Sequence, residues 1–299
     1  MALTRSAGRR PATWRRGRRV RGVAAAALVA LPVGVGVVYM TLGALGMVGP
    51  GSAGNGASPA RIARVLGERA VWEGTLWSLW VAAASTALAT LGAAAVAVAY
   101  RGTRPLDRAG RTLSLLPLAV PHLAAAVGAL LVLGQSGLLA RVALRLGWIA
   151  GPAQMPALVL DPWGWGLILA LTWKELPFLA LVASSVLATH GTALEETARG
   201  LGAGPWAVLL RVTWPTLWRG MLPAAVAVFT FVAGSYEAAA LLAPSDPLAL
   251  PLLTWERHTD AALTRRGDAY VLGLLAVALA ALAVAAHEWL AARGRRSGA

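Results

Sequence analysis

Three charged side chains lie deep within long apolar runs of the sequence. Lys174 and Glu175 lie within the stretch TWKELPF, and Glu237 lies within GSYEAAALL. An ionisable group inside a membrane is costly, so it marks a functional candidate, here as part of the polar lining of a translocation path. Pro177 removes the hydrogen bond that its own amide would make, which predicts a kink beside the two charges. The pathway candidates are Lys174, Glu175, Pro177, Ser235, Tyr236 and Glu237.

Each of these residues also has a structural interpretation. Lys174 and Glu175 would then pair with neighbouring helices and hold the bundle together. Gly234 and Ser235 would let two helices approach closely. The sequence leaves both interpretations open.

The sequence lacks the residues that thiol chemistry, metal binding and ATP binding would require. The chain has no cysteine, so disulfide and thiol chemistry are excluded. Its histidines show no spacing that would suit a metal site; they are His122, His190, His258 and His287. The sequence has no G-x-x-x-x-G-K-[ST] motif and its only lysine is Lys174, so it does not bind ATP through such a loop.

Membrane helices must hold the intramembrane charges. Of the 299 residues, 58% are hydrophobic and 13% are charged, which is typical of a membrane protein. Continuous apolar runs favour helices over a closed barrel, and each is long enough to cross about 30 Å of hydrocarbon. The runs are 22–42, 75–99, 112–134, 163–188, 221–243 and 269–292. We expect short helices outside them at 62–68 and 138–146.

The expected fold is therefore all-α, a polytopic membrane protein with about six transmembrane helices. Most arginines lie in the N-terminal tail, the second and fourth loops and the C-terminal tail. By the positive-inside rule, both termini and the fourth loop are cytoplasmic, and the net charge of +14 reflects topology and anionic lipid rather than nucleic acid. The first run is too long for a signal core, so we expect it to be retained. The parts are a basic tail (1–21), a transmembrane domain (22–292, with a hairpin at 190–217) and a tail (293–299).

The fourth loop carries the signals of a helical hairpin. Thr192 and Glu195 have the spacing of a capping box, which predicts the start of a helix. Gly202 suits the left-handed residue that ends a helix, and Pro205 suits the start of a second one. Pro215 prevents an uninterrupted run into the fifth span without a bend.

This hairpin resembles the signature of binding-protein-dependent ABC import permeases, which reads E-A-A, three residues, G, nine residues, I-x-L-P. The matching positions, with both spacings kept, are Glu196, Thr197, Ala198, then Gly202, then Val212, Thr213, Trp214 and Pro215. The departures from the signature are Thr197, Val212 and the bulky Trp214. The resemblance extends roughly over spans two to six.

The resemblance implies the MetI-like fold of type I importer permeases and a coupling helix that sits in a cleft of a separate ATPase. The coupling residues would be Glu195, Glu196, Ala198, Arg199, Gly202 and Pro215. The implied partners are a dimer of ABC ATPase subunits that binds ATP-Mg, a second permease, similar or identical, and an extracytoplasmic solute-binding protein. No cofactor is expected on this chain, and its place is the bacterial plasma membrane.

The cargo is less well defined. A loose resemblance to polyamine-like or thiamine-like permeases, together with the acids Glu175 and Glu237, favours a cation. Sulfate-like or iron-like cargo is left open.

Three rival classes explain less of the sequence. A secondary transporter or channel would use the intramembrane charges to couple ions, and a membrane scaffold would carry no solute, but neither explains the hairpin. A protease is suggested by the sequence GQSG around Ser136 and by Ala286 before His287, a pair that resembles six-span rhomboid proteases. However, span three runs outward and span six inward, which separates the serine from a base that must lie within about 3 Å.

Overall fold

The computed structural model describes residues 12–50, 52 and 57–297. In this part of the chain helices are the only regular secondary structure, as expected for backbone that must satisfy its own hydrogen bonds in a membrane. Much of the predicted basic tail at 1–21 lies outside the described residues, and the first helix, α1, covers Ala12–Ala44. The all-α prediction is confirmed.

Five stretches of the described chain are long and apolar enough to span a membrane: Arg69–Ala99, His122–Arg145, Trp165–Thr189, Pro205–Ala233 and Leu263–Arg293. They correspond to the predicted spans two to six. The predicted first span falls within α1, where Ala30–Ala44 counts as a shorter apolar helix among the described residues.

The predicted third span begins too early. Its first part belongs to α4, Pro105–Leu115, followed by a 3-10 turn, η1, Leu116–Ala119. The apolar helix itself, α5, covers only His122–Leu133. Pro117 and Pro121 cannot donate backbone hydrogen bonds, so the helix is interrupted between them. The prediction of one helix over 112–134 is therefore wrong.

The predicted fifth span is also divided. The helix α10 covers Trp214–Ala233 and α11 covers Tyr236–Leu242, with a break at Gly234 and Ser235. The prediction of one helix over 221–243 is wrong at this break. Gly234 lacks a side chain to hold it in a helix, and such residues weaken helices by about 1 kcal/mol.

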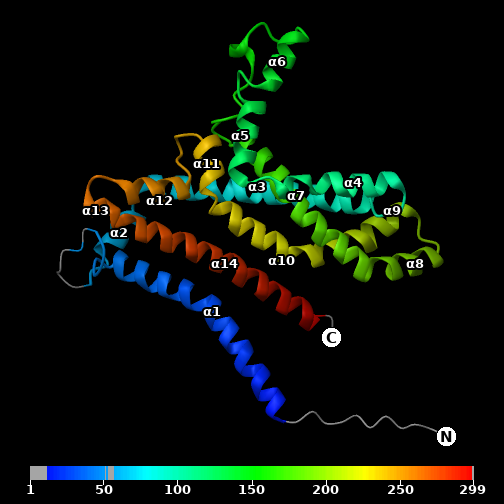
Figure 1. Ribbon diagram of the computed structural model, residues 1–299, viewed down its shortest axis with the longest axis horizontal. Coiled ribbons are helices and arrows are strands. Elements are labelled where there is room, and N and C mark those ends of the chain that lie inside the picture. The colour runs from blue at the N-terminus through cyan, green and yellow to red at the C-terminus, as the bar shows by residue number, and fades with distance from the viewer. Residues whose placement is uncertain (1–11, 51, 53–56, 298–299) are drawn as a thin grey trace.

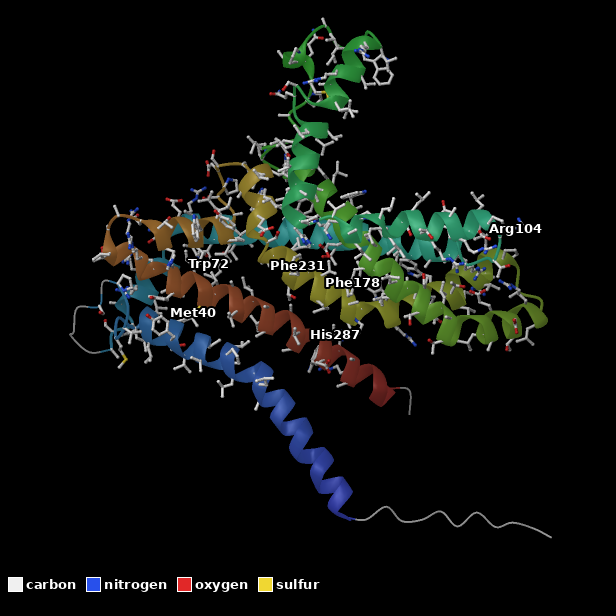
Figure 2. The ribbon with its side chains drawn as sticks, in the orientation of Figure 1. Met40, Trp72, Arg104, Phe178, Phe231 and His287 are labelled. Carbon is white, nitrogen blue, oxygen red and sulfur yellow. The ribbon has the colours of Figure 1, made fainter. Side chains whose placement is uncertain are left out.

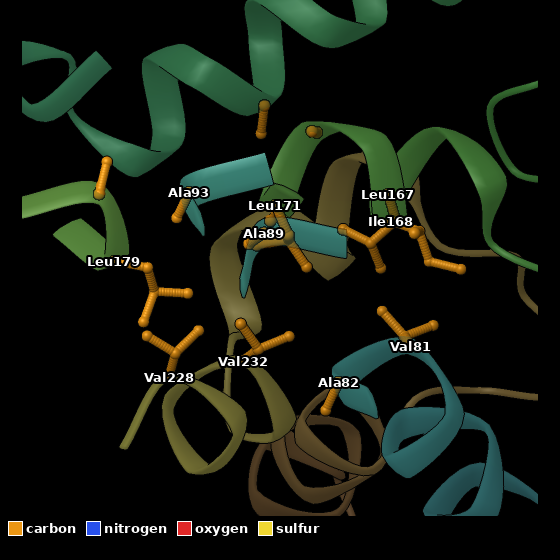
Figure 3. Packing of buried hydrophobic residues seen from close by; sticks show 14 of the residues in the cluster. Val81, Ala82, Ala89, Ala93, Leu167, Ile168, Leu171, Leu179, Val228 and Val232 are labelled. Carbon is orange, nitrogen blue, oxygen red and sulfur yellow. The ribbon is translucent and has the colours of Figure 1, made fainter. Parts of the chain in front are cut away.

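The core lies where α3, Arg69–Ala99, packs against α7, Trp165–Val186, and α10. Small residues on α3 allow the close approach: a Cβ at Gly92 would come within 2.8 Å of Leu176. Figure 3 shows Ala89 and Ala93 of α3 among the branched side chains of the other two helices. These three helices form a packed frame for the segments at either end.

The two ends of this frame differ. Figure 1 shows α2, α12 and α13 together at one end, and α8 and α9 at the other. The bounds of these short helices are Ala60–Leu66, Leu250–Thr259, Leu263–Arg266, Thr192–Gly200 and Pro205–Val208. At the first end Asp268 is fully buried and bonds Arg64 at 2.6 Å, while Arg257 bonds Glu68 at 2.6 Å. This ion network ties α2 and α12 to the start of α14, Asp268–Ser297.

One segment projects from the bundle. Figure 1 shows α5 and α6 pointing away from the other helices, and α6 covers Leu138–Arg145 as predicted. Only 11% of the most apolar part of this segment is buried against the rest of the chain. Figure 2 labels Phe231 on α10 near the base of α5, and its ring lies 5.0 Å from that of His122.

Candidate functional site: the hairpin between α7 and α10

Two π-helical turns join the hairpin to its spans. The turn η3, Leu187–Gly191, leads from α7 into α8 without a break, and η4, Leu209–Thr213, leads from α9 into α10. An α-helix starts at Thr192, where the capping-box spacing predicts it, although it follows the π turn directly rather than a non-helical residue. π-Helical turns are rare and often occur at functional sites.

The second π turn explains how the chain accommodates Pro215. A proline lacks the amide hydrogen that would bond the preceding turn, and a wider turn absorbs this loss. The helix therefore continues from Pro205 to Ala233. The irregularity predicted at Pro215 is confirmed in position, but it is a wide turn within a helix rather than an interruption.

The turn between α8 and α9 forms as predicted. Gly202 has a φ of 85°, a left-handed conformation that favours glycine. Its amide donates to the carbonyl of Arg199 at 2.9 Å, and the amide of Ala203 donates to that of Ala198 at 3.0 Å. This pair of bonds is a Schellman motif. Pro205 then begins α9.

Glu195 is the centre of an internal brace rather than an exposed contact. Glu195 is only 3% exposed. Arg101, in the loop after α3, donates to both carboxylate oxygens at 2.9 and 2.8 Å, and Arg199 donates to one at 2.9 Å. Thr213, in η4, donates through its hydroxyl at 2.6 Å. The carboxylate thus joins α3, α8 and the base of α10, and we call this set of four residues the Glu195 brace.

The electrostatics of the brace keep Glu195 ionised. Burial acts to raise the pKa of its carboxyl group, but the Thr213 hydroxyl and the two guanidinium groups of Arg101 and Arg199 outweigh burial and lower that pKa below its ordinary value. A charged carboxylate with several donors is the arrangement in which burial is tolerated. Glu195 therefore positions the hairpin.

The surface of the hairpin is apolar at its tip. Leu201 is 85% exposed and Trp206 is 75% exposed, although both belong to a polar loop. Glu196 is exposed beside them and Ala198 is half-buried. Sequence reasoning missed Leu201 and Trp206; the available signal was the presence of two large apolar side chains on either side of the predicted turn. Leu201 and Trp206 lie on either side of the Gly202 turn, between the apolar runs 163–188 and 221–243, so they are candidates for contact with a partner.

The pathway candidates separate into two settings. On α7, Lys174 is 7% exposed, Glu175 is 8% exposed and Pro177 is buried. The Nε2 atom of His122 lies 3.0 Å from Oε1 of Glu175, a partner that the sequence did not suggest. Glu175 therefore makes a contact between helices, as the structural interpretation expects.

The other pathway candidates are accessible. On α11, Glu237 is exposed and Tyr236 is 39% exposed, with its ring 5.6 Å from that of Trp255. Ser235 is half-buried at the break before α11. Their role in a pathway stays a prediction.

Comparisons with known proteins agree with this geometry. Residues 89–296 match the family described as the binding-protein-dependent transport system inner membrane component. The chain is 33% identical to the molybdenum transport system permease protein ModB of Mycobacterium tuberculosis over 210 residues, which is 70% of this chain and 75% of ModB. It is 34% identical to the sulfate transport system permease protein CysW of Synechocystis over 119 residues, which is 38% of this chain and 42% of CysW.

Solved structures show the same fold. A chain of a bacterial alginate ABC transporter, crystallised with an alginate-bound periplasmic protein, matches with a TM-score of 0.70 at 15% identity, and the match covers 91% of both chains. The family match covers more than half of this chain and includes the whole hairpin. This chain belongs to the binding-protein-dependent transport system inner membrane components, as the permease subunit of an ATP-driven ABC importer.

Proposed function

We propose that the α8–α9 hairpin docks in a cleft of a separate ATPase subunit and that the spans carry an oxyanion. The observation that carries the docking proposal is the exposed apolar tip formed by Leu201 and Trp206. A hairpin whose backbone is already held in place loses less conformational freedom when a partner covers it. The Glu195 brace and the Schellman turn hold the backbone in this way.

The other hairpin residues have supporting roles in this proposal. Glu196 offers an exposed charge beside the tip, which suits a basic residue of the ATPase. Ala198 and Gly202 are small enough to let the partner approach. Arg199 holds Glu195, and Pro215 fixes the wide turn through which the hairpin joins α10. ATP and its Mg²⁺ would bind to the ATPase, and this chain would carry no cofactor.

The arrangement of the two ends supports a topology. Figure 1 shows the first residues of α1 and the last residues of α14 on the side away from α2 and α13. If the hairpin meets an ATPase, its end of the bundle is cytoplasmic and so are both tails. The opposite end, with α2, α12 and α13, would then face the solute-binding protein.

A second permease, similar or identical, would cover the apolar surfaces that the bundle leaves exposed. The α5–α6 segment is one such surface, and the side of α1 that bears Leu31, Val35 and Val38 is another. Residues this apolar are stable in contact with lipid or with another chain.

The names of the relatives support an oxyanion as cargo. ModB is named for molybdenum transport and CysW for sulfate transport. Molybdate and sulfate are both tetrahedral oxyanions in water. Glu175 faces His122 in the core, which removes one of the two acids that favoured a cation. The polyamine-like or thiamine-like grouping stays a prediction without support from these relatives.

Docking is tested by capture of the ATPase. The tagged permease should retain its ATPase through detergent purification, and Leu201→Asp should release it because an aspartate would have to be buried in the apolar contact. Glu196→Lys should weaken retention by reversing the charge. A matched control is Glu288→Lys, an exposed acid on α14, which should leave retention unchanged. Full retention by Leu201→Asp would overturn the docking proposal.

The rival function, a secondary transporter or channel, makes a different prediction. It expects uptake to continue in cells depleted of ATP while the ion gradient is intact. The ABC importer expects uptake to stop, because closure of the ATPase dimer moves the hairpin. Measurement of radiolabelled sulfate or molybdate uptake under the two conditions separates them.

A further inference from the structure

An open groove lies between α7 and α10 on the flank of the hairpin. Its volume is about 1010 Å³, which is ample for a small solute. Gly220 forms part of its floor, because a Cβ there would come within 2.6 Å of Val186 and would hold the two helices apart. The side chains that define this α7–α10 groove are Ser185, Thr189, Leu194, Arg211, Thr216 and Arg219.

The groove has an unbalanced positive charge. Arg211 and Arg219 line it, and no acidic residue does. In the described part of the chain neither guanidinium makes an ion pair or a hydrogen bond, whereas Arg64, Arg101 and Arg257 all face carboxylates. Two guanidinium groups on a concave wall attract anions, and each can bind an oxyanion through two parallel bonds.

The hydroxyl groups of the groove are not equally available. Thr189 donates to the carbonyl of Ser185 at 2.7 Å, and Thr216 donates to that of Val212 at 2.7 Å. In the described structure the Ser185 hydroxyl has no such partner. The donors that remain for a ligand are therefore Ser185, Arg211 and Arg219, and all three recognise oxygen atoms that carry negative charge.

The groove is mechanically joined to the hairpin. Leu194 on α8 forms part of its wall. Arg211 belongs to the π turn η4, the same turn in which Thr213 bonds Glu195 of the brace. A movement of the hairpin would therefore reach the turn that carries Arg211, whereas Arg219 lies two turns further along on the regular part of α10. An anion that contacts both arginines would therefore be sensitive to the position of the hairpin.

We propose that the α7–α10 groove is an anion site in which Arg211, Arg219 and Ser185 hold a tetrahedral oxyanion at the hairpin end of the spans. The inference rests on the proposed function, which makes this the site where the cargo is last held before release. The same chemistry is found in the phosphate of an anionic lipid. The groove is assigned to the free oxyanion because its walls are built by side chains of both helices and the hairpin, and a lipid source is an outcome of the test.

The test uses the full permease chain in nanodiscs of phosphatidylcholine, titrated with molybdate and, separately, with sulfate by calorimetry. Binding is expected in the wild type. The double variant R211Q/R219Q should bind at least about tenfold more weakly, because the loss of a charge-assisted hydrogen bond lowers affinity by about that factor. R211K/R219K keeps the charge but loses the bidentate geometry and should fall between them. Raising the salt concentration should weaken binding.

A matched control removes two arginines at the same end of the molecule. R104Q/R108Q changes exposed residues of the α4 region that do not line the groove, and Figure 2 places Arg104 at the hairpin end. This control should bind like the wild type. If it weakens binding as much as R211Q/R219Q does, the effect is one of net charge and the site is refuted.

The remaining outcomes separate the sources of the anion and the two proposals. Absence of oxyanion binding, combined with Arg-dependent retention of phosphatidylglycerol during purification, would refute the free-oxyanion site in favour of a lipid. Absence of both would refute any anion site. Uptake by proteoliposomes that contain the permease, the ATPase and the binding protein then tests the proposed cargo separately. If the wild type binds an oxyanion through its arginines but imports neither molybdate nor sulfate, the cargo proposal is refuted and the anion site stands. Normal import and binding by R211Q/R219Q refutes the site and leaves the cargo.

Discussion

Replacement of Glu195 by glutamine tests whether the brace positions the hairpin. The change keeps the size of the side chain and one acceptor for the Thr213 hydroxyl, but it removes the charge that Arg101 and Arg199 contact. Both guanidinium groups are about half exposed, at 44% and 51% of their side chains, so solvent screens them and each contact is worth about 0.5–1 kcal/mol. The expected loss is therefore about 1–2 kcal/mol.

Such a loss should appear locally rather than in the whole bundle. The hairpin is joined to the spans by two π turns, so it can open while the α3–α7 core stays packed. About 1–2 kcal/mol corresponds to a 5–30-fold change in the opening equilibrium. Amide hydrogen exchange between residues 192 and 213 should accelerate by that factor in Glu195→Gln, with no change in α3 or α7.

A double-mutant cycle with Arg101→Gln isolates the contact. If the two residues act through each other, the double variant should exchange little faster than either single variant. Arg108→Gln, an exposed arginine of α4, is the control and should leave exchange unchanged. Additive effects of the Glu195 and Arg101 changes, or acceleration throughout the bundle, would refute the brace.

The remaining predictions concern pH, the turn and the far end of the bundle. The pKa of Glu195 lies below its ordinary value, so the brace should be fully formed above the ordinary carboxyl range and should loosen as the pH falls through that range toward the lowered pKa; the protection factors of the hairpin amides, which correct for the intrinsic pH dependence of exchange, should fall on acidification in the wild type but not in Glu195→Gln. Gly202→Val should cost about 1–3 kcal/mol because of the positive φ at this turn, measured as faster local exchange, whereas an equal effect of Gly200→Val would contradict this reason. Asp268→Asn should lower the free energy of unfolding by about 1–3 kcal/mol, because it removes the buried negative charge that Arg64 and Arg257 share with Glu68; an unchanged melting temperature would contradict the structural role of that network.

The sequence predicted the elements best where one physical cause dominates. Gly202 was predicted to end α8 and Pro205 to begin the next helix, and both predictions are confirmed. Long apolar runs likewise identified five helices that are long enough to span a membrane. The errors occurred where an apolar run contains a backbone break, as at Pro117, Pro121 and Gly234, because hydropathy is insensitive to the hydrogen bonds of the main chain.

The site was harder to predict because its key contacts join distant parts of the chain. The spacing of Thr192 and Glu195 fits a local capping box, yet the carboxylate bonds Arg101, which precedes it by 94 residues, and Thr213. The same applies to His122, which meets Glu175 only after α5 packs on α7. Sequence rules pair a carboxylate with hydrogen-bond donors nearby in the sequence. In the folded chain, donors that are distant in the sequence can come closer and bind more strongly.

The position of the brace determines which spans a moving hairpin can pull. Glu195 is held by Arg101 at the end of α3 and by Thr213 at the base of α10, and α8 itself continues from α7 through η3. A force applied at the tip by an ATPase would therefore reach all three helices of the core together. At the opposite end, the Asp268 network fixes α2 and α12 to α14 and does not involve those core helices except through α3. The two ends are therefore tied to the core in different ways, because the brace joins all three core helices whereas the Asp268 network reaches the core through α3.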